Sequence, residues 1–150
     1  MKFLEYVNSS TDKKVEVYFD MDGVFAELDF GNFDYETIRP IKTVLAIMKE
    51  LHDQGVDVKV LSICRTNEIV KGKIEWLKIN APFLEEKNIY LLSKEENPGI
   101  ESKDLKTNFL KENTNEDHVI IHVDDDITII KQLQKETPNV KVFHVSSVIE

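Results

Sequence analysis

Short apolar runs with β-strand character alternate along this chain with segments whose apolar residues have helical spacing, and this alternation is what most constrains the fold. The strand-like runs lie at 15–19, 56–61, 89–92, 118–123 and 140–145. The helix-like segments between them lie at 41–51, 69–77, 105–110 and 127–133. Strands that alternate with helices over short connectors predict a three-layer, Rossmann-like α/β fold, with about five parallel strands and helices on both faces.

The length and composition indicate one globular domain over residues 1–150. A chain of 150 residues with 41% apolar and 31% charged residues suits a single core without a linker. The single cysteine, Cys64, allows neither an internal disulfide nor a thiolate zinc site, so we expect a reducing, cytoplasmic setting. No apolar run approaches the ~20 residues of a membrane span. The net charge of −9 disfavours binding to long nucleic acids but permits a small phosphorylated ligand.

Polar side chains follow the predicted strands where each strand ends. Because ligands of open α/β sheets bind at the carboxyl ends of the strands, we expect these side chains to converge at one edge. They are Asp20 and Asp22 after the first strand, Ser62 after the second, Asp124 and Asp125 after the fourth, and Lys103 at the start of the preceding helix.

Several carboxylates at one edge repel each other unless a cation lies among them. Hard oxygen ligands of this kind suit Mg²⁺, which binds through one or two carboxylates together with substrate phosphate. A lysine and a hydroxyl beside the metal can hold the other phosphate oxygens. One carboxylate can then attack phosphorus, and an acid two residues later can protonate the leaving oxygen.

These residues resemble the four motifs of the haloacid dehalogenase (HAD) superfamily of phosphohydrolases. The sequence Phe-Asp-Met-Asp-Gly-Val at 19–24 is similar to the first motif, and Val-Leu-Ser at 60–62 to the second. Lys103 is similar to the third, and Val-Asp-Asp at 123–125 to the fourth. The four elements occur in the family's order, each at a predicted strand end or helix start.

The resemblance implies a role for each acid. Asp20 would be the nucleophile and a metal ligand, passing through an aspartyl-phosphate intermediate. Asp22 would be the general acid and base, and its main-chain carbonyl would bind Mg²⁺. Asp125 would complete the metal shell, with Asp124 as a nearby or water-mediated partner.

The resemblance also implies a phosphate-binding pair, Ser62 and a lysine. Lys103 has the family's placement at a helix start, while Lys106 and Lys94 are alternatives for the same role. Asp-Met-Asp-Gly-Val further resembles the 5'(3')-deoxyribonucleotidase-like branch, which implies a nucleotide substrate.

The chain leaves no room for a large cap domain in either interval between motifs. Residues 25–39, rich in aromatic side chains, are therefore interpreted as a short cap or substrate loop, with packing of that loop or a subunit contact as the alternative. A homo-oligomer fits the same observation, because a neighbouring subunit could cover an open site.

Other functions fit the residues less well. A catalytically weak phosphate-binding or regulatory protein, or a phosphatase of macromolecular ends, remains an alternative. A receiver-type signalling domain would need its acid pair early and its phosphorylated aspartate on a middle strand, which here ends in Ser62. A cysteine phosphatase would need a long loop between Cys64 and Arg65, which are adjacent.

Overall fold

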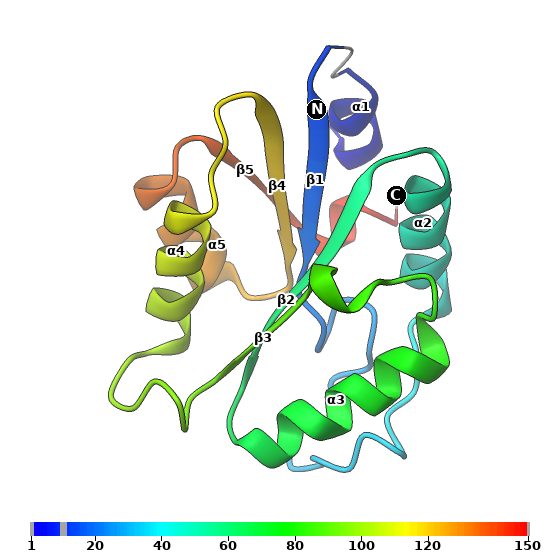
Figure 1. The fold of residues 1–150 in the computed structure, drawn as a ribbon, viewed down its shortest axis with the longest axis vertical. Helices are drawn as coiled ribbons and strands as arrows, with labels where there is room; N and C mark the ends of the chain where they lie inside the picture. The colour runs from blue at the N-terminus through cyan, green and yellow to red at the C-terminus, as the bar shows by residue number, and fades with distance from the viewer. Residues whose placement is uncertain (1, 10–11, 150) are drawn as a thin grey trace.

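The fold is a parallel five-stranded sheet between two layers of helices (Figure 1). The computed structural model describes residues 2–9 and 12–149. The sheet order is β3-β2-β1-β4-β5, and every neighbouring pair is parallel, which confirms the predicted α/β class. The strands are β1 (Lys14–Phe19), β2 (Asp57–Cys64), β3 (Ile89–Ser93), β4 (His118–Asp124) and β5 (Val140–His144).

Two separate apolar layers hold the helices to the two faces of the sheet. One face carries α1 (Phe3–Ser9), α2 (Lys42–Asp53) and α3 (Asn67–Asn80), and the other α4 (Ser102–Glu112) and α5 (Ile127–Glu136). Short 3-10 helices cover Glu86–Asn88 and Val145–Ser147. Within 2–9 and 12–149, no helix is long and apolar enough to cross a bilayer.

The central strand β1 contributes to both apolar layers, because its side chains alternate between the faces. Val17 and Phe19 pack toward α1–α3, and Tyr18 packs toward α4 and α5. The Tyr18 ring meets the Phe109 ring of α4 nearly edge-on, with 5.8 Å between centroids. Since β1 has a neighbour on either side and a layer on either face, its C-terminal end lies at the middle of the carboxyl edge of the sheet.

Helix α1 was not predicted, because two turns are too short to show a helical period. It is held by burial of Phe3, whose ring lies edge-on to Phe19 and to Phe143 at centroid distances of 6.1 and 5.6 Å. The helix therefore closes one edge of the apolar layer that contains α2 and α3.

One predicted boundary is wrong, and two helix starts show details of their own. Pro40 lies before α2 and forms an antiparallel bridge with Ala26. Ser102 begins α4, and the residue before it, Glu101, makes no side-chain cap. Strand β2 continues past Ser62 to Cys64, because β3 pairs with it to that residue, so the Ser62 side chain projects from within a strand.

The segment between β1 and α2 folds down on α3. Phe25 is fully buried, with its ring centroid 5.9 Å from that of Trp76. The Trp76 indole Nε1 donates to the Ile38 carbonyl at 2.9 Å. Phe30 and Phe33 remain exposed. The aromatic residues of this segment thus divide between packing and solvent, and α3 fixes the path of the loop.

Candidate active site

The carboxyl ends of β1 and β4 bring two predicted site residues together. These strands pair in register, with Phe19 opposite Val123, and the Asp20 N–H donates to the Val123 carbonyl at 2.9 Å. Asp20 and Asp124 are therefore neighbours, although about a hundred residues separate them in sequence. The chain leaves β1 toward β2 on one side and returns to β4 on the other, which makes this the switch point where α/β sheets bind ligands.

Three carboxylates meet at this point. Oxygen atoms of Asp20, Asp124 and Asp125 all lie within 4.8 Å of one another. Gly23 closes the turn that follows β1, with a φ of +80°, and a Cβ built on it would stand 2.1 Å from Asp125 Oδ2. Glycine is required there twice over, because the backbone is left-handed and Asp125 occupies the space of a side chain.

Lys106, one of the two alternatives to Lys103, supplies the ammonium group of this cluster, and Lys103 lies outside it. Lys106 Nζ lies 2.7 Å from Asp124 Oδ2 and 3.1 Å from Asp20 Oδ1, with the side chain almost fully buried. The Lys103 side chain is 44% exposed and its Nζ lies 3.6 Å from a carboxylate oxygen of Glu101.

The physical reason lies in the packing of α4. Lys106 shares its helix face with Leu110, four residues on, and that face is buried against the sheet. Lys103 lies on the same face one turn earlier, in the first turn of α4, where the side chain is exposed. The place of Lys106 between the apolar residues Leu105 and Leu110 is a feature of the sequence that could have drawn attention to it.

Burial and mutual charge raise the pKa values of three groups in the cluster. Burial raises the pKa of Asp20, against the lowering effect of the Lys106 charge. Burial, together with the charges of Asp20 and Asp124, raises the pKa of Asp125 to about 7. The pKa of Lys106 is raised, because its two carboxylate partners outweigh the effect of burial.

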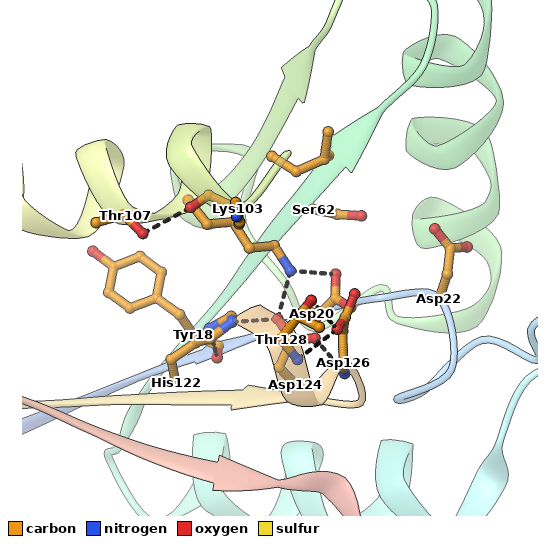
Figure 2. Close-up of polar contacts among 12 residues, drawn as sticks. Tyr18, Asp20, Asp22, Ser62, Lys103, Thr107, His122, Asp124, Asp126 and Thr128 are labelled. Atoms are coloured by element: carbon orange, nitrogen blue, oxygen red, sulfur yellow. Dashed lines mark hydrogen bonds and ion pairs between the residues drawn. The ribbon is translucent and has the colours of Figure 1, made fainter. Parts of the chain in front are cut away.

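Asp124 is saturated with hydrogen bonds and acts as a support for its neighbours (Figure 2). Its Oδ2 is contacted by Lys106 and by His122 Nε2 at 2.8 Å, while its Oδ1 accepts from the Asp126 N–H at 3.0 Å. The fully buried His122 ring is fixed from its other side, where Nδ1 donates to the Tyr18 carbonyl at 2.9 Å. Although burial opposes it, these partners hold the pKa of Asp124 well below its usual range.

Asp22 lies apart from this cluster (Figure 2). It pairs with a different lysine, Lys73. Lys73 Nζ of α3 lies 2.8 Å from Asp22 Oδ2 and donates to Ser62 Oγ, also at 2.8 Å. It donates further to the Ile63 carbonyl at 3.1 Å, and only 1% of Lys73 is exposed. The predicted residues Asp22 and Ser62 are thus joined by a residue to which the sequence assigned no functional role.

The loop between β1 and α2 reaches the same carboxylate. The Tyr35 hydroxyl donates to Asp22 Oδ1 at 2.7 Å. Burial and the adjacent Asp22 charge raise the pKa of Tyr35 well above its usual range, so the phenol keeps its proton. The 25–39 segment therefore contributes a polar group to the site in addition to packing on α3.

A cavity of about 290 Å³ opens beside Asp22. Its walls come from the β1–α2 loop, the end of β2, helix α3 and the segment after β3. The lining residues are Asp22, Phe33, Tyr35, Ile63, Arg65, Ile69, Lys73, Lys94 and Ser102. Lys94 therefore belongs to this cavity and not to the acid cluster.

Cys64 does not fit a nucleophilic role. Its thiol is buried at the end of β2, and burial raises its pKa, so the unreactive neutral form prevails. Arg65, next in sequence, is exposed and lines the cavity.

The acid cluster has the donor chemistry of a magnesium site. Carboxylate oxygens are the ligands that Mg²⁺ prefers, and three carboxylates meet here beside one lysine. Because Asp124 already accepts from three partners, Asp20 and Asp125 have the carboxylate oxygens available for direct coordination.

Comparison with solved structures identifies the fold. A chain of the Pnkp1/Rnl/Hen1 complex is 20% identical with a TM-score of 0.68, covering 91% of this chain and 46% of that one. The phosphatase-containing N-terminal part of BF1531 from Bacteroides fragilis, complexed with Mg, is 16% identical with a TM-score of 0.59, covering 88% and 36%. The HAD domain of effector protein Lem4 from Legionella pneumophila is 13% identical with a TM-score of 0.51, covering 87% and 86%.

These likenesses confirm the predicted HAD-like fold. At 13–20% identity they show architecture alone, and the chain spans less than half the length of the first two chains it matches. Neither a protein-family model nor a curated protein sequence matches the chain.

Proposed function

We propose that this protein is a Mg²⁺-dependent phosphomonoester hydrolase that works through a phosphorylated Asp20. The observation that carries the proposal is the contact of Lys106 Nζ with Asp20 Oδ1, at 3.1 Å, inside a cluster of three acids at the sheet's switch point. A buried carboxylate beside a buried ammonium, with two further acids for a cation, is an inventory suited to phosphoryl transfer, which needs positioning and charge stabilisation above all. Similarity in fold to a phosphatase domain complexed with Mg supports the same reading.

The proposed reaction has two steps, in which Asp20 and Asp22 act in turn. An Asp20 oxygen attacks phosphorus while the bond from phosphorus to the leaving oxygen breaks, and Asp22 gives that oxygen a proton. Asp22 then takes a proton from the water that attacks the phosphorylated Asp20, which releases inorganic phosphate, frees the Asp20 carboxylate and returns Asp22 to its protonated form. Lys106 and Ser62 bind the phosphoryl oxygens.

Asp20, Asp125 and the main-chain carbonyl of Asp22 would hold Mg²⁺. The ion supplies positive charge for the phosphoryl oxygens during transfer. The buried Lys73 and Tyr35 hold the Asp22 carboxylate in place through contacts of 2.8 and 2.7 Å.

A nucleotide is the proposed substrate, free or at the end of a polynucleotide. The first-motif sequence resembles that of deoxyribonucleotidase-like enzymes. A fold neighbour belongs to an assembly described as an RNA repair complex, which supports the polynucleotide end as the second candidate.

The test is a hydrolysis panel in Mg²⁺ and in chelator, with acid-quench trapping of labelled phosphoprotein. We expect Mg²⁺-dependent phosphate release and label on the wild type, and neither with Asp20→Asn. Asp117→Asn is the matched control, because Asp117 is exposed in the turn before β4. Turnover that survives in Asp20→Asn would refute the mechanism, and metal-dependent ligand binding without any turnover would favour a regulatory protein.

A further inference from the structure

We propose that the substrate carries a second anionic group on its leaving alcohol, and that Arg65 and Lys94 bind that group. This inference rests on the proposed phosphatase function and narrows its substrate class. Its starting point is the cavity of about 290 Å³ beside Asp22, which both cations line.

The position of Asp22 decides which part of the substrate this cavity meets. As the group that protonates the leaving oxygen, Asp22 faces the alcohol side of the scissile bond. Asp22 and Lys73 line the cavity, whereas Asp20, Asp125 and Lys106 do not. The alcohol, and not the transferring phosphoryl group, therefore occupies the space between Asp22 and Arg65.

The cavity is positively charged in an otherwise acidic protein. Lys73 is neutralised by Asp22 at 2.8 Å. Within the described parts of the chain, by contrast, no carboxylate lies within 4.0 Å of the charged groups of Arg65 or Lys94. Two uncompensated cations in one cavity of a protein with net charge −9 mark a binding site for an anion.

The acids nearest in sequence to Lys94 are turned elsewhere. Glu95 Oε1 accepts from the Asn67 main-chain N–H at 3.2 Å, and Glu96 Oε1 accepts from Asn67 Nδ2 at 2.9 Å. Both carboxylates thus accept hydrogen bonds from Asn67, the first residue of α3, and neither glutamate lines the cavity.

Arg65 is positioned by an aromatic side chain of the β1–α2 loop. Its guanidinium carbon lies 5.0 Å from the centre of the Phe33 ring, a cation–π contact. This contact does not use the N–H donors of the guanidinium as hydrogen-bond partners of a carboxylate, so they can bind a phosphate or carboxylate group of a ligand. The half-exposed Phe33 ring, which adds little to the core, thus positions the Arg65 guanidinium.

The second anionic group that we propose is a phosphate. Both a nucleoside bisphosphate and the adjoining phosphodiester of a polynucleotide end would provide it. The experiment compares kcat/KM for adenosine 3',5'-bisphosphate with that for adenosine 3'-monophosphate and adenosine 5'-monophosphate. Chromatography of the product shows whether the enzyme removes the 3'- or the 5'-phosphate of the bisphosphate. The reference substrate is then the monophosphate that carries the phosphate at the same position.

We expect the wild type to prefer the bisphosphate about tenfold or more, the effect of one charge-assisted contact. In Arg65→Gln and Lys94→Gln this ratio falls, and in the double variant it approaches one. Lys131→Gln is the control, since Lys131 is exposed on α5 and its loss changes the net charge equally. An oligonucleotide ending in the same phosphate distinguishes a polynucleotide end from a free bisphosphate.

A wild-type ratio near one, or a ratio that Arg65→Gln and Lys94→Gln leave intact, overturns the inference while the phosphatase proposal stands. Absence of Mg²⁺-dependent hydrolysis for every substrate, p-nitrophenyl phosphate included, overturns the proposed function instead. In that case, isothermal titration calorimetry tests the anion site by binding, without hydrolysis. Tighter binding of the bisphosphate than of either monophosphate, lost in the double variant, supports the anion site, and equal binding refutes it.

Discussion

Lys73 joins Asp22 to Ser62 through two contacts of 2.8 Å, although Lys73 follows Asp22 by 51 residues. The ammonium is buried, so its charge acts on Asp22 with little screening from solvent. In the proposed mechanism this contact holds the general acid at the leaving oxygen.

Removal of the Lys73 ammonium should lower kcat more than it changes KM. Lys73→Met keeps the buried stem but frees the Asp22 carboxylate, and we expect kcat to fall about 100-fold, the contribution of a positioned general acid. Lys71→Met, at an exposed position of α3, should leave kcat unchanged. Steady-state kinetics and the pH profile of kcat measure the effect, and an unchanged kcat in Lys73→Met would contradict it.

Lys106 and Lys103 should behave differently on substitution. Lys106→Met leaves the buried carboxylates of Asp20 and Asp124 without their partner, which costs about 3–5 kcal/mol of unfolding free energy. Activity should be abolished with it. Lys103→Met should keep both activity and stability, because Lys103 is 44% exposed on its side chain. Denaturant titration measures the stability of the two variants, and phosphate release measures their activity. A loss of activity in Lys103→Met alone would make Lys103, and not Lys106, the phosphate-binding lysine.

Gly23→Ala should weaken metal binding by displacing Asp125. Its Cβ would lie 2.1 Å from Asp125 Oδ2, so the carboxylate must move. We expect Mg²⁺ affinity to fall about tenfold, together with roughly 1–3 kcal/mol of backbone strain. Gly55→Ala separates the two effects, because Gly55 has a φ of +90° with no atom within 4 Å of the added Cβ. Calorimetric titration with Mg²⁺ should show equal affinity for Gly55→Ala and wild type.

Mg²⁺ should stabilise the protein more at pH 8 than at pH 6. The pKa of Asp125 is raised by burial and by the charges of Asp20 and Asp124 to about 7, above its value in the unfolded chain. Without metal, the folded state therefore loses stability as pH rises from about 4 to about 7, because Asp125 must ionise beside other carboxylates. The ion relieves this repulsion and competes with the proton below pH 7.

Thermal unfolding with and without Mg²⁺ at both pH values measures this difference. Asp125→Asn should reduce the pH dependence of the metal effect. A metal-induced shift in Tm that is equal at pH 6 and pH 8 would show that Asp125 does not couple the metal to the proton.

Local sequence patterns were sufficient for the sheet and for the acids of the site. Alternating strand and helix periods predict the parallel sheet, and an acid that directly follows a buried parallel strand has to emerge at its carboxyl edge. For this reason Asp20 and Asp125 could be assigned to one place from sequence alone. Helix α1 could not be predicted from local sequence, since its two turns owe their stability to burial of Phe3 against Phe19.

The tertiary structure alone decided which long side chains reach the acids. A lysine side chain is flexible, and its target depends on how the helix packs on the sheet, which a local pattern does not specify. Lys106 and Lys73 both lie in apolar stripes and are buried with their ammonium groups on carboxylates, while Lys103 stays at the surface. The sequence thus determined where the strands deliver their acids, and the packing of α3 and α4 determined which cations meet them.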